Sequence, residues 1–403
     1  MSKNIYLKNN ISSSYFSKKT YLKDKIKISK IIKNIFISID STKDTFYSYS
    51  KKFKFNFKQS QLTRFDKYKS IIVIGMGGSA LASEASYFFF KEKIKKIFIF
   101  LDNIDQLKIE EIKKKINFKN SLFIIISKSG NTLETLINSN IFNSKINSKN
   151  AIIITGKKIN SLNNYAKDKR ILHIIHKDYI GGRYSALSEV GMIPAYFMGL
   201  KINHFRKNLL EFFKSKKKAL LIDNVVKLTH IYKYKKINSI ILLNYAPEIN
   251  EFLYWCQQLI AESLGKKGKG ILPVVSLAPK DHHSLLQLYL DGPKDKLFYI
   301  FSLKLNKKMR TNKNIFGKNF RYADNKDLSK VKEAQKNALI HVLKKKNIPY
   351  QEFIINKKSE EALGELFSYF MMETALIGKL LGVNPFDQPA VEQVKILTKK
   401  YLS

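Results

Sequence analysis

The chain has 403 residues, 44% hydrophobic and 12% aromatic, so it is long enough for two globular domains and too apolar for a disordered protein. Its 73 basic and 32 acidic residues give a net charge of +41, which alone suggests nucleic acid or an acidic membrane as partner. The basic residues are mainly lysines dispersed from end to end, whereas a nucleic-acid interface concentrates arginines and stacking aromatics on one element. We interpret the charge as compositional and expect no nucleic-acid partner.

The cysteine content and the distribution of apolar residues bear on location. The single cysteine, Cys256, excludes an internal disulfide and is typical of a protein of the reducing cytoplasm. No apolar run approaches the length that spans a bilayer, and the first residues do not lead into the apolar segment of a secretory signal. We therefore expect a cytoplasmic location and no membrane partner.

The first part of the chain predicts an arm followed by an α/β unit. Residues 1–60 are polar, with isoleucines at helical spacing between Ile26 and Ile37, and predict a helical arm and a loop. Short apolar runs then alternate with longer helical patterns, as buried parallel strands and their crossover helices do. The predicted strands of this unit are 71–74, 97–101, 122–126, 152–154 and 171–175.

A second α/β unit is predicted after a long helical stretch at 185–235. Its strands are expected at 240–243, 271–275, 297–303 and 352–355, and its last helices at 360–380 and from Pro389 to the end. The fold class is thus α/β, with two α/β/α sandwiches and mainly parallel sheets. The predicted divisions are an arm at 1–60, domains at 61–205 and 206–385, and a C-terminal helix at 386–403.

A glycine-rich loop follows the first predicted strand. In Gly75-Met76-Gly77-Gly78-Ser79-Ala80, the glycines let the backbone approach an anion at a helix N-terminus, which makes Gly78 and Ser79 candidate phosphate-binding residues. The loop also fits the dinucleotide fingerprint G-x-G-x-x-A, with Asp102 as the ribose-binding acid, so a dehydrogenase is an alternative. A tight turn between strand and helix is a third interpretation.

A second candidate anion site ends the third predicted strand, where hydroxyls and a cation occur together: Ser127, Lys128, Ser129 and Thr132. A helix is expected to begin here, so its free N–H groups would face a ligand. A dinucleotide fold has no need of this second loop, whereas a small phosphorylated substrate held between two strand ends does. Hydroxyl-rich helix caps are also common, so a purely structural role is the alternative.

The predicted helix 247–264 carries a carboxylate and an amide one turn apart. Gln258 and Glu262 are four residues apart, so both side chains can address one ligand. Arg183, on the loop Gly181-Gly182-Arg183-Tyr184-Ser185, supplies a guanidinium that can steady an oxyanion or make a salt bridge. A base and a facing cation are what proton abstraction next to a carbonyl requires. An amphipathic helix with a solvated glutamate is the alternative.

Two adjacent histidines, His282 and His283, are predicted in the first turn of a helix after Pro279. The positive end of a helix lowers the pKa of a histidine, which favours the neutral, proton-accepting form. Metal binding is the other use of paired histidines, but adjacent residues on a helix point in different directions and no other histidine or cysteine lies nearby in sequence. We expect no metal site.

Six motifs in this order resemble those of the glucose-6-phosphate isomerase family: GMGGSA, SKSGNTLET, GGRYS, QQLIAESLGK, HSLLQL and FDQPAVEQVK. Each motif is weak alone, and their order over more than three hundred residues is what makes the resemblance specific. It implies two sugar-isomerase-type domains and the interconversion of glucose 6-phosphate and fructose 6-phosphate in glycolysis and gluconeogenesis, without a cofactor. It also implies a homodimer in which the catalytic histidine, here His283, comes from the other copy.

The resemblance assigns roles to individual residues. Glu262 matches the base that moves the proton between C1 and C2, and Arg183 matches the residue that stabilises the cis-enediolate. His283 and Lys395 match the pair that opens the sugar ring. Gln258 corresponds to a substrate-contacting amide. The residues that correspond to the phosphate pocket are Gly78, Ser79, Ser127, Lys128, Ser129 and Thr132.

The Ser129-Gly130-Asn131-Thr132 segment departs from many members of the family and resembles the loop of isomerases that accept both glucose and mannose 6-phosphates. A dual-specificity phosphoglucose/phosphomannose isomerase is therefore an alternative. A sugar-phosphate-sensing regulator is another, although such regulators join one domain of this kind to a helix-turn-helix, which the first seventy residues do not show.

Overall fold

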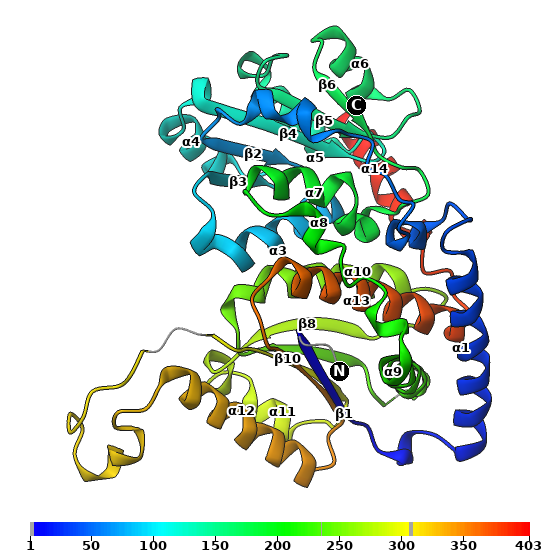
Figure 1. Cartoon of the computed structure of the whole chain (residues 1–403), viewed down its shortest axis with the longest axis vertical. Helices are drawn as coiled ribbons and strands as arrows, with labels where there is room; N and C mark the ends of the chain where they lie inside the picture. The colour runs from blue at the N-terminus through cyan, green and yellow to red at the C-terminus, as the bar shows by residue number, and fades with distance from the viewer. Residues whose placement is uncertain (1–3, 235, 306–308) are drawn as a thin grey trace.

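The computed structural model describes residues 4–234, 236–305 and 309–403 and places two sheet-containing units one above the other (Figure 1). The first sheet is fully parallel, with strand order β3-β2-β4-β5-β6. Its strands are β2 (Ser70–Ile74), β3 (Ile97–Leu101), β4 (Ser121–Ser127), β5 (Ala151–Thr155) and β6 (Leu172–Ile175). All five strands lie at the predicted positions, because each is an isoleucine-rich run bounded by polar residues.

Both faces of the first sheet are covered by helices. Alternate residues of β2 point to opposite sides, so Ile71 and Val73 join the core shared with the second unit while Ile72 and Ile74 join an outer core. The covering helices are α3 (Leu81–Phe90) and α7 (Glu189–Phe197) on the inner side, and α4 (Gln106–Lys115), α5 (Leu133–Ile141) and α6 (Ser161–Asp168) on the outer side. This is the α/β/α sandwich predicted from the sequence.

The second sheet has the order β1-β10-β9-β7-β8, with β1 antiparallel to its neighbour and the other four strands parallel. Its strands are β1 (Ile5–Asn10), β7 (Ser239–Asn244), β8 (Leu272–Leu277), β9 (Lys296–Leu303) and β10 (Tyr350–Ile355). The inner face carries α1 (Lys18–Ser38), α9 (Ser215–Lys233), α10 (Asn250–Leu264) and α13 (Glu360–Leu381), and the outer face carries α11 (Leu286–Asp291) and α12 (Leu328–Lys345). The mixed α/β class with mainly parallel sheets is confirmed.

The N-terminal segment differs from the prediction. The helical arm exists as α1, but the residues before it form β1, which pairs residue by residue with β10 from Ile5 opposite Ile355 to Asn10 opposite Tyr350. Ile5 and Leu7 are buried, and α1 buries Ile28 and Ile32. The first residues therefore complete the edge of the second sheet instead of only preceding the first one. The long helical stretch expected at 185–235 is also divided, into α7, α8 (Ile202–Phe205) and α9.

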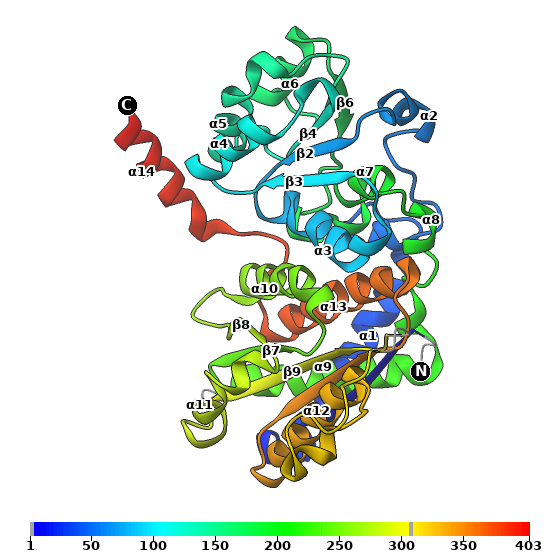
Figure 2. The ribbon, with the colours of Figure 1, turned by 90° about the vertical axis from the view of Figure 1, so that its left-hand side faces the viewer.

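The C-terminal helix α14 (Glu392–Leu402) follows a turn at Pro389–Val391, close to the predicted start. Figure 2 shows it projecting beside the first unit, and nearly all its side chains are exposed. The short helix α2 (Gln59–Leu62) precedes the first sheet. Within the described residues, no helix is both long enough and apolar enough for a membrane span.

Candidate active site

Arg183 is the centre of the predicted site in the structure. It lies on the turn Gly182–Leu187 that follows β6, and it is only 3% exposed. The guanidinium uses all five of its N–H donors within the protein. Its acceptors are Ser263 Oγ for Nε (2.8 Å), Glu262 Oε2 and Gln388 Oε1 for Nη1 (both 3.1 Å), and the carbonyl oxygens of Pro385 (2.6 Å) and Asp387 (2.9 Å) for Nη2. One side chain thus joins the first unit, α10 and the segment before α14.

Gln258 and Glu262 lie one turn apart on α10, as predicted, and they contact each other. Gln258 Nε2 donates to Glu262 Oε1 at 2.9 Å, so the two carboxylate oxygens of Glu262 receive one bond from Gln258 and one from Arg183. The Gln258 carbonyl oxygen is buried and has no partner among the described groups. The Glu262 side chain is 32% exposed. Both side chains therefore keep capacity for a ligand, unlike the solvated glutamate of the alternative interpretation.

A cavity of about 340 Å³ opens beside this group. Its lining includes Glu262 on α10 and Lys266 just after that helix, together with Asp387 and Gln388 from the segment before α14. Lys266 Nζ lies 2.9 Å from Asp387 Oδ1, and burial lowers the pKa of Lys266. The end of α10 and the C-terminal segment are thus held together around an opening that reaches Glu262.

The glycine-rich loop after β2 packs directly against these residues. A Cβ atom on Gly77 would lie 2.6 Å from Gln258 Nε2, and one on Gly78 would lie 2.4 Å from the carbonyl carbon of Gly182. Only glycine permits such an approach. The Ser185 hydroxyl lies between the two loops, 2.6 Å from the Gly182 carbonyl and 3.2 Å from the Gly78 carbonyl. Three of the six sequence motifs therefore meet at one point.

The loop after β4 gathers three hydroxyls. Ser127 Oγ is 2.8 Å from Thr132 Oγ1, and Ser129 Oγ is 3.4 Å from both. The backbone N–H of Asn131 also donates to Ser129, and α5 begins at Leu133. Hydroxyls and N–H groups at the start of a helix are suited to phosphate oxygens.

Lys128 behaves differently from the prediction that placed it with the anion-binding groups. Its Nζ donates to the carbonyl oxygens of Asp178 and Ile180, both at 2.8 Å. Burial lowers the pKa of Lys128, and this effect outweighs the opposing charge of Asp178. In this structure Lys128 therefore stabilises the segment that leads into Gly181 and Arg183. Its ammonium contacts these backbone carbonyls.

The structure does not bring His283 and Lys395 to Glu262 within one chain. His283 ends a short 3-10 turn, Lys280–His282, and the predicted helix begins only at Leu286, so the expected position in a first helical turn is wrong. That segment leads into α11, on the opposite face of the second sheet from α10 (Figure 2). His282 Nε2 lies 2.7 Å from the Tyr245 hydroxyl, and burial, not a helix end, lowers its pKa.

Lys395 lies on α14, where it pairs with Glu392 at 2.6 Å and remains 60% exposed. No contact in the described part of the chain connects it with Arg183 or Glu262. A role for Lys395 in the site thus requires a different placement of α14.

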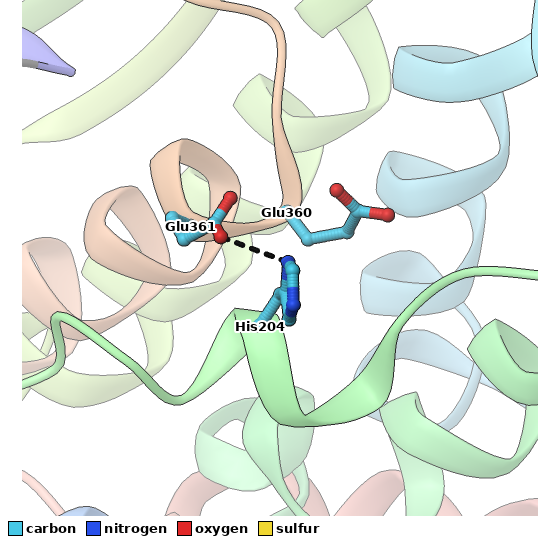
Figure 3. A group of neighbouring side chains, drawn as sticks. All are labelled: His204, Glu360 and Glu361. Carbon is cyan, nitrogen blue, oxygen red and sulfur yellow. Dashed lines mark ion pairs between the residues drawn. The ribbon is translucent and has the colours of Figure 1, made fainter.

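Among the residues that the structure describes, one group of side chains has metal-ligating chemistry: His204 on α8 with Glu360 and Glu361 in the first turn of α13 (Figure 3). His204 Nδ1 is 2.9 Å from Glu361 Oε1, and Lys207 Nζ is 3.3 Å from the same oxygen. Carboxylates in a first turn also interact favourably with the helix dipole. Glu361 already has partners within the protein, so we assign the group to a polar network that ties α8 to α13.

Sequence reasoning missed two residues of the Arg183 network. Gln388 stands inside the FDQPAVEQVK motif and Ser263 directly follows Glu262, so both were within quoted motifs without a role. Their polarity beside motif residues was the available signal, but only the fold shows that both contact Arg183.

Solved structures of other proteins share this fold. The chain resembles the crystal structure of a hypothetical protein from Thermus thermophilus, with a TM-score of 0.85 over 98% of this chain and 100% of that one, at 22% identity. It also resembles a glucose-6-phosphate isomerase from Chlamydia trachomatis, with a TM-score of 0.72 over 85% and 71% of the two chains, at 20% identity. These two matches show a shared fold of two α/β units with mainly parallel sheets.

The sequence comparisons are more specific. A model of the phosphoglucose isomerase family matches residues 23–403, so the chain belongs to that family of aldose–ketose isomerases. It is 33% identical to the glucose-6-phosphate isomerase of Methanocaldococcus jannaschii, over 82% of this chain and 85% of the relative. It is also 33% identical to that of Campylobacter jejuni, over 83% and 86%. The family match favours an isomerase over the dehydrogenase alternative, and it confirms the resemblance seen in the sequence.

Proposed function

We propose that this chain interconverts glucose 6-phosphate and fructose 6-phosphate through a cis-enediol intermediate. The observation that carries the proposal is the contact between Glu262, Arg183 and Gln258 at the point where both units and the glycine-rich loop meet. Isomerisation must remove a weakly acidic C–H proton and stabilise the oxyanion that results, and a carboxylate beside a guanidinium supplies both functions.

In the proposed mechanism the substrate phosphate binds the three hydroxyls of Ser127, Ser129 and Thr132, with Gly78 and Ser79 on the neighbouring loop. The distance between this cluster and Glu262 is bridged by the body of the sugar. Glu262 takes the proton from C2 of the aldose and returns it to C1, while the C2 hydroxyl loses its proton and the C1 oxygen gains one, and Gln258 orients the carboxylate. Arg183 Nη1 then exchanges one of its protein acceptors for the enediolate oxygen.

Ring opening is assigned to His283 and Lys395, and the separation of His283 from Glu262 supports contribution by a second copy in a homodimer. Subunit complementation tests this assignment. Glu262→Gln and His283→Ala each inactivate a homodimer, but a mixed dimer has one site with both residues intact if the histidine crosses the interface. Mixing the two inactive proteins under subunit exchange should restore up to about half the activity per hybrid dimer, whereas persistent inactivity despite exchange would contradict a shared site.

The functional test is an assay of isomerase activity in which fructose 6-phosphate formation is coupled to a detectable reaction. Activity with glucose 6-phosphate is expected, and its absence with either sugar phosphate would contradict the proposal. Mannose 6-phosphate in the same assay tests the dual-specificity alternative suggested by the Gly130-Asn131 segment. We also place the enzyme in the cytoplasm, consistent with its single buried cysteine, and propose no nucleic-acid or membrane partner.

A further inference from the structure

Ser263 follows the proposed base directly but points away from it. It is fully buried on α10, whereas the neighbouring Glu262 side chain reaches the cavity. Its Oγ is 2.8 Å from Arg183 Nε and 3.0 Å from the Tyr184 hydroxyl. A buried hydroxyl with two hydrogen-bonding partners beside the site does more than fill space in the core.

The chemistry of the partners fixes the direction of each bond. Arg183 Nε is only a donor, so Ser263 Oγ accepts from it. The Pro385 carbonyl is only an acceptor, so the Tyr184 hydroxyl, 3.3 Å away, donates its single proton there. The Ser263 proton is then directed to the Tyr184 oxygen. Because Arg183 Nη2 also donates to Pro385 at 2.6 Å, the four residues close a ring of hydrogen bonds.

This ring acts on one edge of the guanidinium. Nε is held by Ser263, and Nη2 is held by the carbonyl oxygens of Pro385 and Asp387. Bonds at both nitrogens of that edge prevent rotation of the planar group about its long axis. The remaining nitrogen, Nη1, is thereby aimed between Glu262 and Gln388.

We propose that Ser263 is a positioning residue of the isomerisation, which sets the rotation of Arg183 so that Nη1 faces the place where the enediolate oxygen forms. The inference rests on the proposed function. A preorganised donor stabilises developing charge without having to reorient, and a displacement of about 1 Å in such a group can reduce turnover on the order of 10²-fold.

The surroundings of the ring favour a fixed arrangement. Tyr184 is fully buried, the Arg183 guanidinium carbon lies 5.4 Å from its ring centroid, and Phe386 packs 5.3 Å from the same ring. Burial raises the pKa of Tyr184 to about 12, so its hydroxyl remains a neutral donor at physiological pH. Water is therefore a poor substitute for Ser263 in holding Nε.

The test is Ser263→Ala, with steady-state kinetics and the binding of two inhibitor classes. We expect a fall in kcat of about 10- to 100-fold with KM changed less than about 3-fold, because substrate binding at the phosphate is untouched. A phosphorylated hydroxamate that mimics the enediolate should bind about 10-fold more weakly or worse, while an acyclic polyol phosphate should bind as before. Ser368→Ala is the matched control, since Ser368 is equally buried but donates only to a backbone carbonyl on α13.

Ser263→Cys keeps the volume of the site but offers a weak acceptor, and it provides the same measurement if the alanine variant does not fold. Its kcat should lie between those of the native enzyme and the alanine variant. Native kcat and native hydroxamate affinity in either folded variant would overturn the positioning role. An increase of KM with unchanged kcat would overturn it as well. If the native chain itself does not isomerise sugar phosphates, the proposed function fails, and that outcome is separate from the result for Ser263.

Discussion

Replacing Arg183 with lysine keeps the positive charge but removes the planar group that makes five hydrogen bonds. A lysine ammonium has three donors on one atom, so at least two of the five acceptors lose their partner. The two buried acceptors are Ser263 Oγ and the Pro385 carbonyl. At about 1 to 3 kcal/mol for each unsatisfied buried group, loss of one or both of these bonds in Arg183→Lys should lower the free energy of unfolding by about 1 to 6 kcal/mol. That is a large share of the roughly 5 to 15 kcal/mol typical of a domain.

The same substitution removes the fork that faces Glu262, so kcat should fall on the order of 10²- to 10³-fold. Denaturant unfolding and the coupled isomerase assay measure the two effects separately. Arg206→Lys is the matched control: Arg206 is also held in a largely buried place, by carbonyl oxygens of Leu187 and Ser50, without contacting the site. The kcat of Arg206→Lys should equal that of the native enzyme. An Arg183→Lys variant that folds and retains more than about one third of native kcat would refute the role given to Arg183.

Two further predictions concern the phosphate loop and the core. Gly130→Ala should raise KM on the order of 10-fold, because φ is +68° and a Cβ would lie 1.8 Å from Asn160 Oδ1. Gly199→Ala is the control: it has the same backbone strain, at φ +76°, but open space around it, so KM should not change. Burial raises the pKa of Glu373 from 4.5 to about 8, so the folded state keeps a proton that the unfolded state releases. Thermal scans should therefore show that the stability of the protein falls as pH rises from about 4.5 to 8. Glu373→Gln should flatten this dependence, and an unchanged pH profile would contradict it.

The sequence predicted most strands because their burial is local information. The run Ile71–Ile74 is apolar at every position, and such a run forms a buried strand wherever parallel neighbours cover it. In contrast, β1 was missed because its apolar run ends at Leu7 and is followed by polar residues, so its strand state depends on pairing with β10 more than three hundred residues later.

The site was predictable in its residue types but not in its contacts. Gln258 and Glu262 share one helix, so their spacing alone placed them together. The Arg183 network joins residues about 80 and 200 positions apart, and no periodicity encodes which carbonyl a guanidinium reaches. Lys128 shows the same limit. Its residue type predicted that it binds an anion, whereas in the structure its ammonium donates to two backbone carbonyls.

The most direct test of Glu262 as the base is the exchange of solvent deuterium into the sugar phosphate at the carbon next to the carbonyl, measured for the native enzyme and for Glu262→Gln. Glutamine preserves the shape of the side chain and its bond from Gln258 or Arg183, but it cannot take a proton. The native enzyme should incorporate deuterium during turnover, and the variant should lose exchange together with at least about 10²- to 10⁴-fold of kcat while its affinity for a polyol phosphate stays near native. Near-native turnover and exchange in the variant would contradict the account and move the base to another group in the cavity.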